Sequence, residues 1–173
     1  DVAGVQHHQV ARLDGQIRVV GFLTGSHGIA ASARLAIRAF QSLGIEVETV
    51  DVAEARLAWN SRDKVPLKPG PWIFHLNAPE LLAAMAYLGP ERVRGPRYGY
   101  WAWELPRAPA AWVKDAALID EVWAPSTYTA EAFEGARAPV RVVPHPLFME
   151  DYLGTVPAPR EPGFLAVSRW CAT

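Results

Sequence analysis

The chain is poor in sulfur-containing residues. Its 173 residues include two methionines and one cysteine, Cys171. A lone cysteine forms no internal disulfide and has no partners for a zinc site, which fits a reducing compartment. The sequence therefore predicts no disulfide framework, no metal site and no cofactor metal.

The chain also lacks an excess of charge and a long apolar run. It carries 17 basic and 18 acidic residues, for a net charge of -1. This balance predicts a small or neutral substrate and no nucleic-acid partner, because nucleic-acid binders concentrate positive charge. No apolar run approaches the roughly 20 residues that span a bilayer, and the N-terminus lacks a signal-peptide pattern. We expect a soluble or peripheral cytoplasmic protein.

Half of the residues are hydrophobic, enough for one domain with a substantial core. Short apolar runs alternate with helical patterns. The expected strands are 17–23, 45–50, 72–76, 98–103, 121–124 and 140–143. The expected helices run from 29 to Gly44, from Pro79 to Gly89, from Pro109 to 116, and from Ser126 towards Gly135. This alternation predicts an α/β fold: a Rossmann-like, doubly wound parallel sheet with helices on both faces.

The pattern changes after residue 147. Residues 148–162 are proline-rich and lose periodicity, as an interdomain linker does. Residues 163–167 form a new apolar run close to the end of the chain, which begins with Asp1 rather than Met. We therefore expect one domain over 1–147, a linker over 148–162, and the start of a truncated second domain over 163–173.

Polar and aromatic residues follow the expected strands directly. In an open parallel sheet, ligands bind beyond the carboxyl ends of the strands, so these residues are the candidates for a site. They are Gly25, Ser26, His27, Gly28, Asn77, Trp103, Glu104, Ser126 and His145. If the sheet forms as predicted, the 24–28 turn and Glu104 open onto one shared cavity.

The 24–28 turn, TGSHG, precedes an expected helix. Its glycines could let the backbone approach a phosphate or a sugar near the positive end of the helix dipole, or could only permit a tight turn. The sequence is not GxGxxG, which weakens a dinucleotide-binding interpretation. That alternative, an NAD-type domain, would use Asp51 as the ribose ligand.

Aromatic side chains crowd residues 98–112. Their faces suit the apolar faces of sugar rings, and indole N–H groups bond hydroxyls. Because alternate residues of a buried strand belong to the core, either Trp101 or Trp103 is expected only to pack, as is Trp112. A non-catalytic carbohydrate-binding module would use the same aromatics, and it remains a second alternative.

Structural interpretations compete for several of these candidates. Ser126 follows a proline and is expected to cap a helix, and Asn77 could do the same before Pro79. His145, between two prolines, could contact a ligand or be a buried, hydrogen-bonded histidine. His75 lies within a strand and is expected to belong to the core or the sheet face.

Three segments together resemble the N-terminal half of a family 4 (group 1) glycosyltransferase of the two-domain GT-B kind. They are GYWAWELP (99–106), DEVWAPSTYTAEAF (120–133) and VRVVPHPL (140–147), and the resemblance covers roughly residues 17–147. It implies transfer of a sugar from a nucleotide-sugar to a glycan or lipid-linked acceptor, with retention of configuration and no essential metal. It also implies that a missing C-terminal domain binds the nucleotide, so that the fragment alone is inactive.

The resemblance assigns roles to the candidates. Glu104 would bind a hydroxyl or position the acceptor, with general-base duty as the alternative. The 24–28 turn would touch the donor and the acceptor, Asn77 would face the acceptor, and His145 would lie towards the cleft. A basic cluster of Arg92, Arg94, Arg97 and Arg107 is either a solvated surface or a site for an anionic headgroup, which would imply peripheral contact with the inner membrane face.

Overall fold

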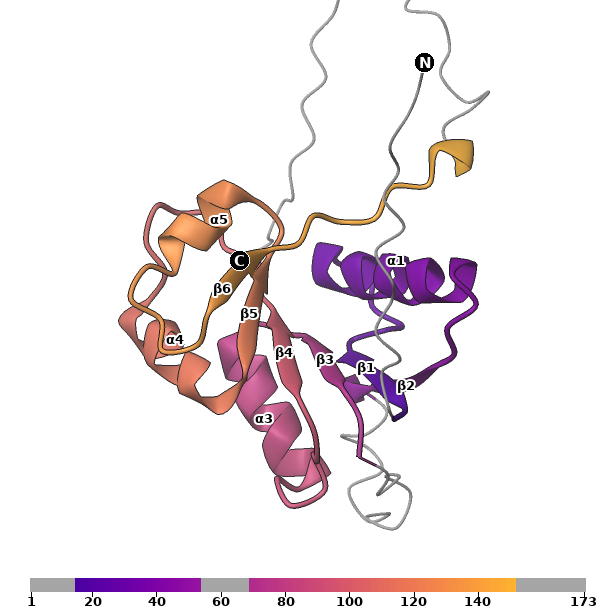
Figure 1. Ribbon diagram of the computed structural model, residues 1–173. Helices are drawn as coiled ribbons and strands as arrows, with labels where there is room; N and C mark the ends of the chain where they lie inside the picture. The colour runs from indigo at the N-terminus through magenta and orange to yellow at the C-terminus, as the bar shows by residue number, and fades with distance from the viewer. Residues whose placement is uncertain (1–14, 54–68, 152–173) are drawn as a thin grey trace, which may run out of the picture.

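The computed structural model describes residues 15–53 and 69–151 (Figure 1). The strands are β1 (Ile17–Gly21), β2 (Val47–Asp51), β3 (Trp72–His75), β4 (Arg97–Tyr100), β5 (Glu121–Ala124) and β6 (Val140–Val142). The α-helices are α1 (Gly28–Ser42), α3 (Ala78–Leu88), α4 (Ala110–Asp115) and α5 (Thr127–Ala132), with 3₁₀ turns η2 (Ala116–Leu118) and η3 (Met149–Asp151). The predicted alternation of strands and helices is confirmed.

The six strands form one sheet in the order β2-β1-β3-β4-β5-β6. Every neighbouring pair is parallel, as predicted. The chain moves from β1 outwards to β2 and then returns to the other side of β1 to form β3. The strand order therefore reverses between β1 and β3, and a crevice opens beyond the carboxyl ends of strands at such a point.

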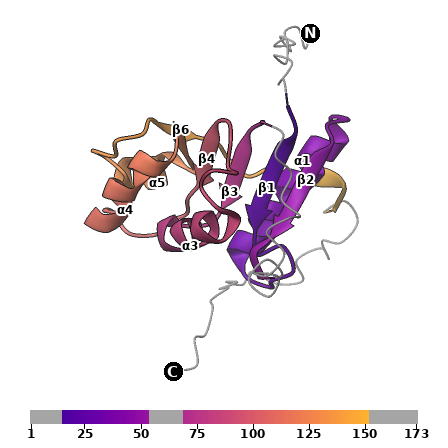
Figure 2. The same ribbon diagram turned by 90° about the horizontal axis from the view of Figure 1, so that it is seen from below.

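Helices cover both faces of the sheet, as the doubly wound fold requires (Figures 1 and 2). Helix α1 packs on β1, β2 and β3 on one face. The crossovers that carry α3, α4 and α5 run in the opposite direction along the sheet. Because such crossovers are right-handed, these three helices lie on the other face. Among the described helices, three thus cover one face and α1 covers the other.

The apolar core lies between the sheet and α3, α4 and α5. Trp72, Phe74, Trp101 and Phe133 are its largest fully buried apolar side chains. Gly99 makes room for this packing, since a Cβ there would lie 2.7 Å from Ile119 Cδ1 and 2.8 Å from Trp101 Nε1.

Several element boundaries differ from the sequence-based prediction. The strand expected over 98–103 ends at Tyr100. Beyond it, the backbone N–H of Ala102 bonds to the Asn77 side chain rather than to a neighbouring strand. The strand expected over 17–23 ends at Gly21, and two residues lie between it and the 24–28 turn. These apolar runs therefore continue past the end of regular pairing.

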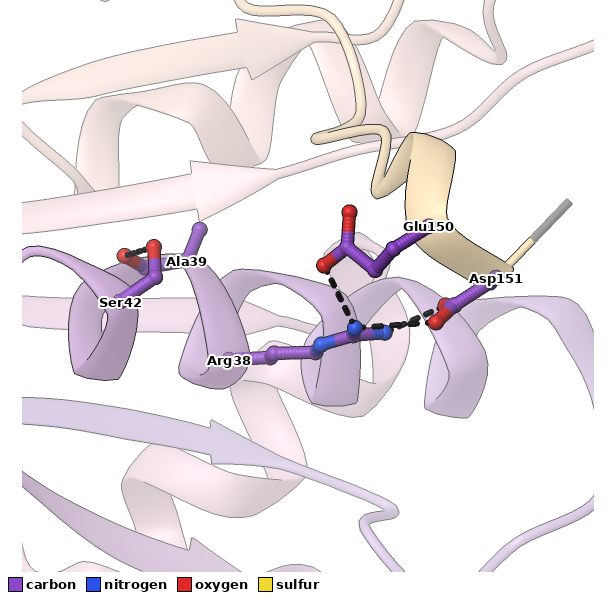
Figure 3. A network of polar contacts seen from close by, with 5 residues as sticks. All are labelled: Arg38, Ala39, Ser42, Glu150 and Asp151. Carbon is purple, nitrogen blue, oxygen red and sulfur yellow. Dashed lines mark hydrogen bonds and ion pairs between the residues drawn. The ribbon is translucent and has the colours of Figure 1, made fainter. Parts of the chain in front are cut away.

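After β6 the chain turns back towards α1, and we call residues 143–151 the return segment. Arg38 of α1 binds the carboxylates of Glu150 and Asp151 (Figure 3). Its guanidinium also lies 3.8 Å from the centre of the Phe148 ring. The first residues of the predicted linker are thus fastened to α1, while 152–162 and the second domain expected over 163–173 lie outside the described residues.

Candidate functional site

A cleft of about 710 Å³ lies at the carboxyl ends of the strands. Four separate parts of the chain form it: the start of α1, the residue after β3, the end of β4 with the loop that follows, and the return segment. Its lining residues are His27, Gly28, Ile29, Ser32, Asn77, Tyr100, Ala102, Trp103, Glu104, Leu105 and His145.

Most of the candidates chosen from the sequence meet in this cleft. Those that line it are His27, Gly28, Asn77, Trp103, Glu104 and His145. The turn before α1 and Glu104 thus open onto one cavity, as the predicted sheet required. Gly25, Ser26 and Ser126 lie outside the lining. Ser126 caps α5 by accepting a bond from the Thr129 N–H, as expected.

The turn before α1 is built around His27. Its Nδ1 accepts a bond from the Ala30 N–H at 3.3 Å and caps the helix. A Cβ on Gly25 would lie 2.8 Å from His27 Nε2, so the glycine makes room for the imidazole. Because Nδ1 accepts, neutral His27 carries its proton on Nε2, the ring nitrogen beside Gly25.

Asn77 links the ends of two neighbouring strands. It occupies the N-cap position of α3, but its side chain does not cap the helix, so that interpretation is wrong. Instead, Oδ1 accepts a bond of 3.0 Å from the Ala102 N–H. Ala102 needs this acceptor because regular strand pairing has ended at Tyr100. Asn77 therefore positions the loop that carries Glu104.

Trp103 and Glu104 differ in what they offer a ligand. The Trp103 indole N–H donates to the Arg107 carbonyl at 2.8 Å, and its ring packs edge-on against Trp112. The half-buried Trp103 thus lends the cleft ring surface, while its N–H is engaged within the loop. Trp101 is fully buried and only packs. Glu104 is exposed and places a carboxylate at the cleft.

A polar network joins the cleft to the face of the sheet under α1. Ser32 Oγ lies 3.1 Å from His75 Nδ1 and 3.2 Å from His145 Nδ1. The Tyr100 hydroxyl donates to the Val143 carbonyl at 2.8 Å and lies 3.1 Å from His145 Nδ1. The return segment is therefore held to α1 through His145 and to β4 through His145 and Val143.

Burial keeps this network uncharged near neutral pH. It lowers the pKa of His75 to about 3, and the proximity of His145 adds to the shift. Burial also lowers the pKa of His145 and raises the pKa of Tyr100 to about 12. Both imidazoles and the phenol are therefore neutral at pH 7.

The donors and acceptors of this network fix where its protons lie. Because the Tyr100 proton is given to Val143, His145 Nδ1 must be the donor to the Tyr100 oxygen. Neutral His145 then carries a lone pair on Nε2. His145, which is exposed beside the cleft, thus offers a hydrogen-bond acceptor or a weak base.

The structure also locates His75, the arginines of the predicted basic cluster and Asp51. His75 is 2% exposed and belongs to the core, as expected. Arg97 begins β4 and pairs with Asp120, whereas Arg107 follows the opposite end of that strand. The arginines of the predicted basic cluster therefore do not share one end of the sheet. The Asp51 carboxylate, the ribose ligand of the NAD alternative, accepts bonds from the Thr24 and Ala53 N–H groups.

The described part of the chain offers neither a metal-binding group nor a membrane-spanning helix. Residues 15–53 and 69–151 contain no group of His, Cys, Asp and Glu side chains arranged to hold a metal ion. Within the same residues, no helix has the length and apolar character needed to cross a bilayer.

Ser32 and Tyr100 were not among the site residues expected from the sequence, although Tyr100 belongs to the aromatic group of residues 98–112. The expected site residues follow strands, whereas Ser32 lies within α1 and Tyr100 is the last residue of β4. A signal for Ser32 was present, because it lies one turn after Gly28 among the alanines that face the sheet.

No family model, curated protein or solved structure matches this chain. The geometry of the cleft therefore has to carry a functional proposal.

Proposed function

We propose that this domain is the acceptor-binding half of a retaining GT-B glycosyltransferase. The intact enzyme would transfer a sugar from a nucleotide-sugar to an acceptor hydroxyl. The observation that carries the proposal is the convergence of the His27–Gly28 turn, Glu104 and His145 on one cleft at the carboxyl ends of a parallel sheet. The resemblance of residues 17–147 to the N-terminal half of such enzymes supports the same function.

The groups around the cleft suit recognition of a sugar. Glu104 supplies carboxylate oxygens and His145 Nε2 supplies a lone pair, both of which accept bonds from hydroxyls. The N-terminus of α1, which begins at Gly28, favours an anionic group such as the diphosphate of a donor. In this proposal Glu104 binds and positions the acceptor hydroxyl, and a second domain binds the nucleotide.

The experiment compares the 173-residue chain with the complete protein encoded by its open reading frame. Both are screened with a panel of nucleotide-sugars and glycoside acceptors. We expect transfer only by the complete protein. Transfer by the 173 residues alone would contradict the division of labour between two domains. Glycoside binding without transfer by the complete protein would instead favour the carbohydrate-binding module.

The role of Glu104 is tested in the complete protein with Glu104→Gln. This change keeps the size of the side chain but removes the charge, so we expect kcat/KM for the acceptor to fall about tenfold or more. Glu131→Gln, on an exposed glutamate of α5 outside the cleft, is the matched control and should leave kcat/KM unchanged. Equal effects of the two changes would remove Glu104 from the site.

A further inference from the structure

A second pocket lies on the face of the sheet that α1 covers. Its volume is about 140 Å³. The later turns of α1 form one wall with Ala36, Ala39 and Phe40, and strands β3 to β5 form the floor with Ile73 and Trp123. Residues 143–146 of the return segment form a further wall.

The size and lining of the pocket suit a single aromatic ring. An apolar cavity of about 150 Å³ in another protein stays dry and binds benzene, so a pocket of this volume is large enough for a ring. An α-helix of a partner protein, about 10 Å across, would need much more room. Phe40, Tyr100 and Trp123 present ring surfaces, against which another ring packs favourably.

The pocket adjoins the cleft. Ser32, Tyr100 and His145 line both cavities. Their hydroxyl and Nδ1 atoms bond to one another and to neighbouring groups, so the boundary is held in place by the molecule itself. A single ligand that spans the boundary would meet hydrogen-bonding groups on one side and apolar side chains on the other.

We infer that the acceptor carries an aryl group, which enters the pocket under α1 while its hydroxyl-bearing part lies in the cleft. This inference rests on the proposed function, since it specifies the class of acceptor for the same site. The ring would pack against Phe40 and Trp123. The glycosyl or alcohol part would reach Glu104 and the Nε2 atom of His145.

The test is an NMR titration of the 173-residue chain with methyl, phenyl and octyl β-glucosides, and with phenol alone. Backbone signals of Asn77, Ala102 and Glu104 report on the cleft, and those of Ala36 and Ala39 report on the pocket. We expect all three glucosides to shift the cleft signals. Phenyl glucoside should also shift the pocket signals and bind about tenfold or more tightly than methyl glucoside, because burial of the ring adds affinity.

Two variants fill the pocket without changing the cleft. Ala39→Leu and Ala36→Leu each add a bulky side chain to the α1 wall, and either should abolish the phenyl advantage while leaving methyl glucoside binding unchanged. Ala86→Leu, at an exposed position of α3 on the other face of the sheet, is the matched control and should keep the advantage. Dispersed amide spectra establish that each variant is folded.

The outcomes separate this inference from the proposed function. Equal affinities for methyl and phenyl glucosides, or an advantage that survives both pocket-filling variants, would overturn the inference and leave the proposed function standing. If octyl glucoside gains as much affinity over methyl glucoside as phenyl glucoside does, or more, the pocket suits a linear alkyl chain as well as a ring. That result would also overturn the inference. If no glucoside shifts the cleft signals, the acceptor role itself fails, whatever phenol does in the pocket.

Discussion

Along β3, Trp72 and Phe74 lie on the face covered by α3, whereas Ile73 and His75 lie on the face covered by α1. On the first face the side chains join a continuous apolar core. On the second, His75 joins a hydrogen-bonded network and both residues line an open pocket. Consecutive residues of one strand therefore belong to two environments, one that serves packing and one that leaves room for a ligand.

The same division continues along β4. Gly99 and Trp101 lie on the core side, where the missing Cβ of the glycine makes room for the indole. Tyr98 and Tyr100 lie on the α1 side, where Tyr98 stacks on Trp123 and Tyr100 stacks on His75. Because α1 is the one described helix on that side, aromatic surface is left beside the cleft. We propose that stability resides mainly on the three-helix face and binding on the other.

The sharpest test of this division is Trp101→Ala on the core face. Trp101 is fully buried between Phe133 and Trp112, so its removal leaves a large cavity. We expect the free energy of unfolding to fall by about 3–5 kcal/mol, measured by urea denaturation. Trp123→Ala, which removes a half-buried indole on the α1 face, is the control and should cost clearly less. Similar losses for both variants would contradict the assignment of stability to one face.

The alternation of strands and helices was predictable because each strand is a short apolar run bounded by turn residues. The strand expected over 121–124 matches β5, and Gly44 and Gly89 follow α1 and α3 with positive φ, as helix-ending glycines do. The end of β4 was not predictable. Residues 101–103 continue the apolar run, and only the contact between Asn77 and Ala102 shows that pairing has stopped.

The candidate site was predictable only where it follows from topology. Parallel strands bring the residues after their carboxyl ends together, which identified Asn77, Glu104 and His145. The partners of His145 could not be derived from local sequence. Ser32 lies 113 residues away in the chain and Tyr100 lies 45 away, and only the path of the return segment brings them together.

The network on the α1 face should make stability depend on acid. In the unfolded chain His75 takes up a proton near its usual pKa of 6.5, whereas burial lowers its pKa to about 3 in the folded protein. Between these values the unfolded state binds more protons, so stability falls as the pH falls from 6.5 towards 3. We expect a loss on the order of a few kcal/mol by pH 4, measured by urea denaturation at a series of pH values.

His75→Phe tests whether this residue is the source of the acid dependence. Phenylalanine keeps a ring stacked on Tyr100 but cannot take up a proton. The slope between pH 6.5 and pH 4 should become much shallower. The residual slope belongs to His145, whose pKa burial also lowers. An unchanged slope in His75→Phe would place the acid-sensitive group elsewhere.

Asn77→Ala and Ser126→Ala form a matched pair with smaller effects. Each removes a side-chain acceptor for a backbone N–H, of Ala102 in the first case and of Thr129 in the second. Each should lower the free energy of unfolding by about 1 kcal/mol. Only Asn77→Ala releases the loop that carries Glu104, so it alone should weaken glucoside binding in the NMR titration. Equal effects of the two changes on binding would show that the loop needs no anchor.

The smallest effect on stability is expected from Arg38→Ala. Arg38 joins α1 to Glu150 and Asp151 (Figure 3), but its side chain is 40% exposed and those of its partners are 64% and 47% exposed. Exposed ion pairs contribute little because water and salt screen them, so urea denaturation should give nearly the same midpoint for the variant. The change should instead appear locally, as faster hydrogen exchange at the Asp151 N–H, which bonds to the Phe148 carbonyl.

Acid should reproduce the effect of Arg38→Ala in the unmodified protein. The hydrogen bond from Arg38 lowers the pKa of Asp151 below its usual value of 3.8, so the contact with α1 is complete above that pH. As the pH falls through the lowered pKa, the carboxylate takes up a proton and exchange at residue 151 should approach that of the variant. If Arg38→Ala also shifts the NMR signals of His145, the contact of Arg38 with Glu150 and Asp151 helps to position His145 at the cleft. If those signals do not shift, Ser32 and Tyr100 hold His145 by themselves. The position of His145 at the cleft is then independent of the contact between Arg38 and residues 150–151.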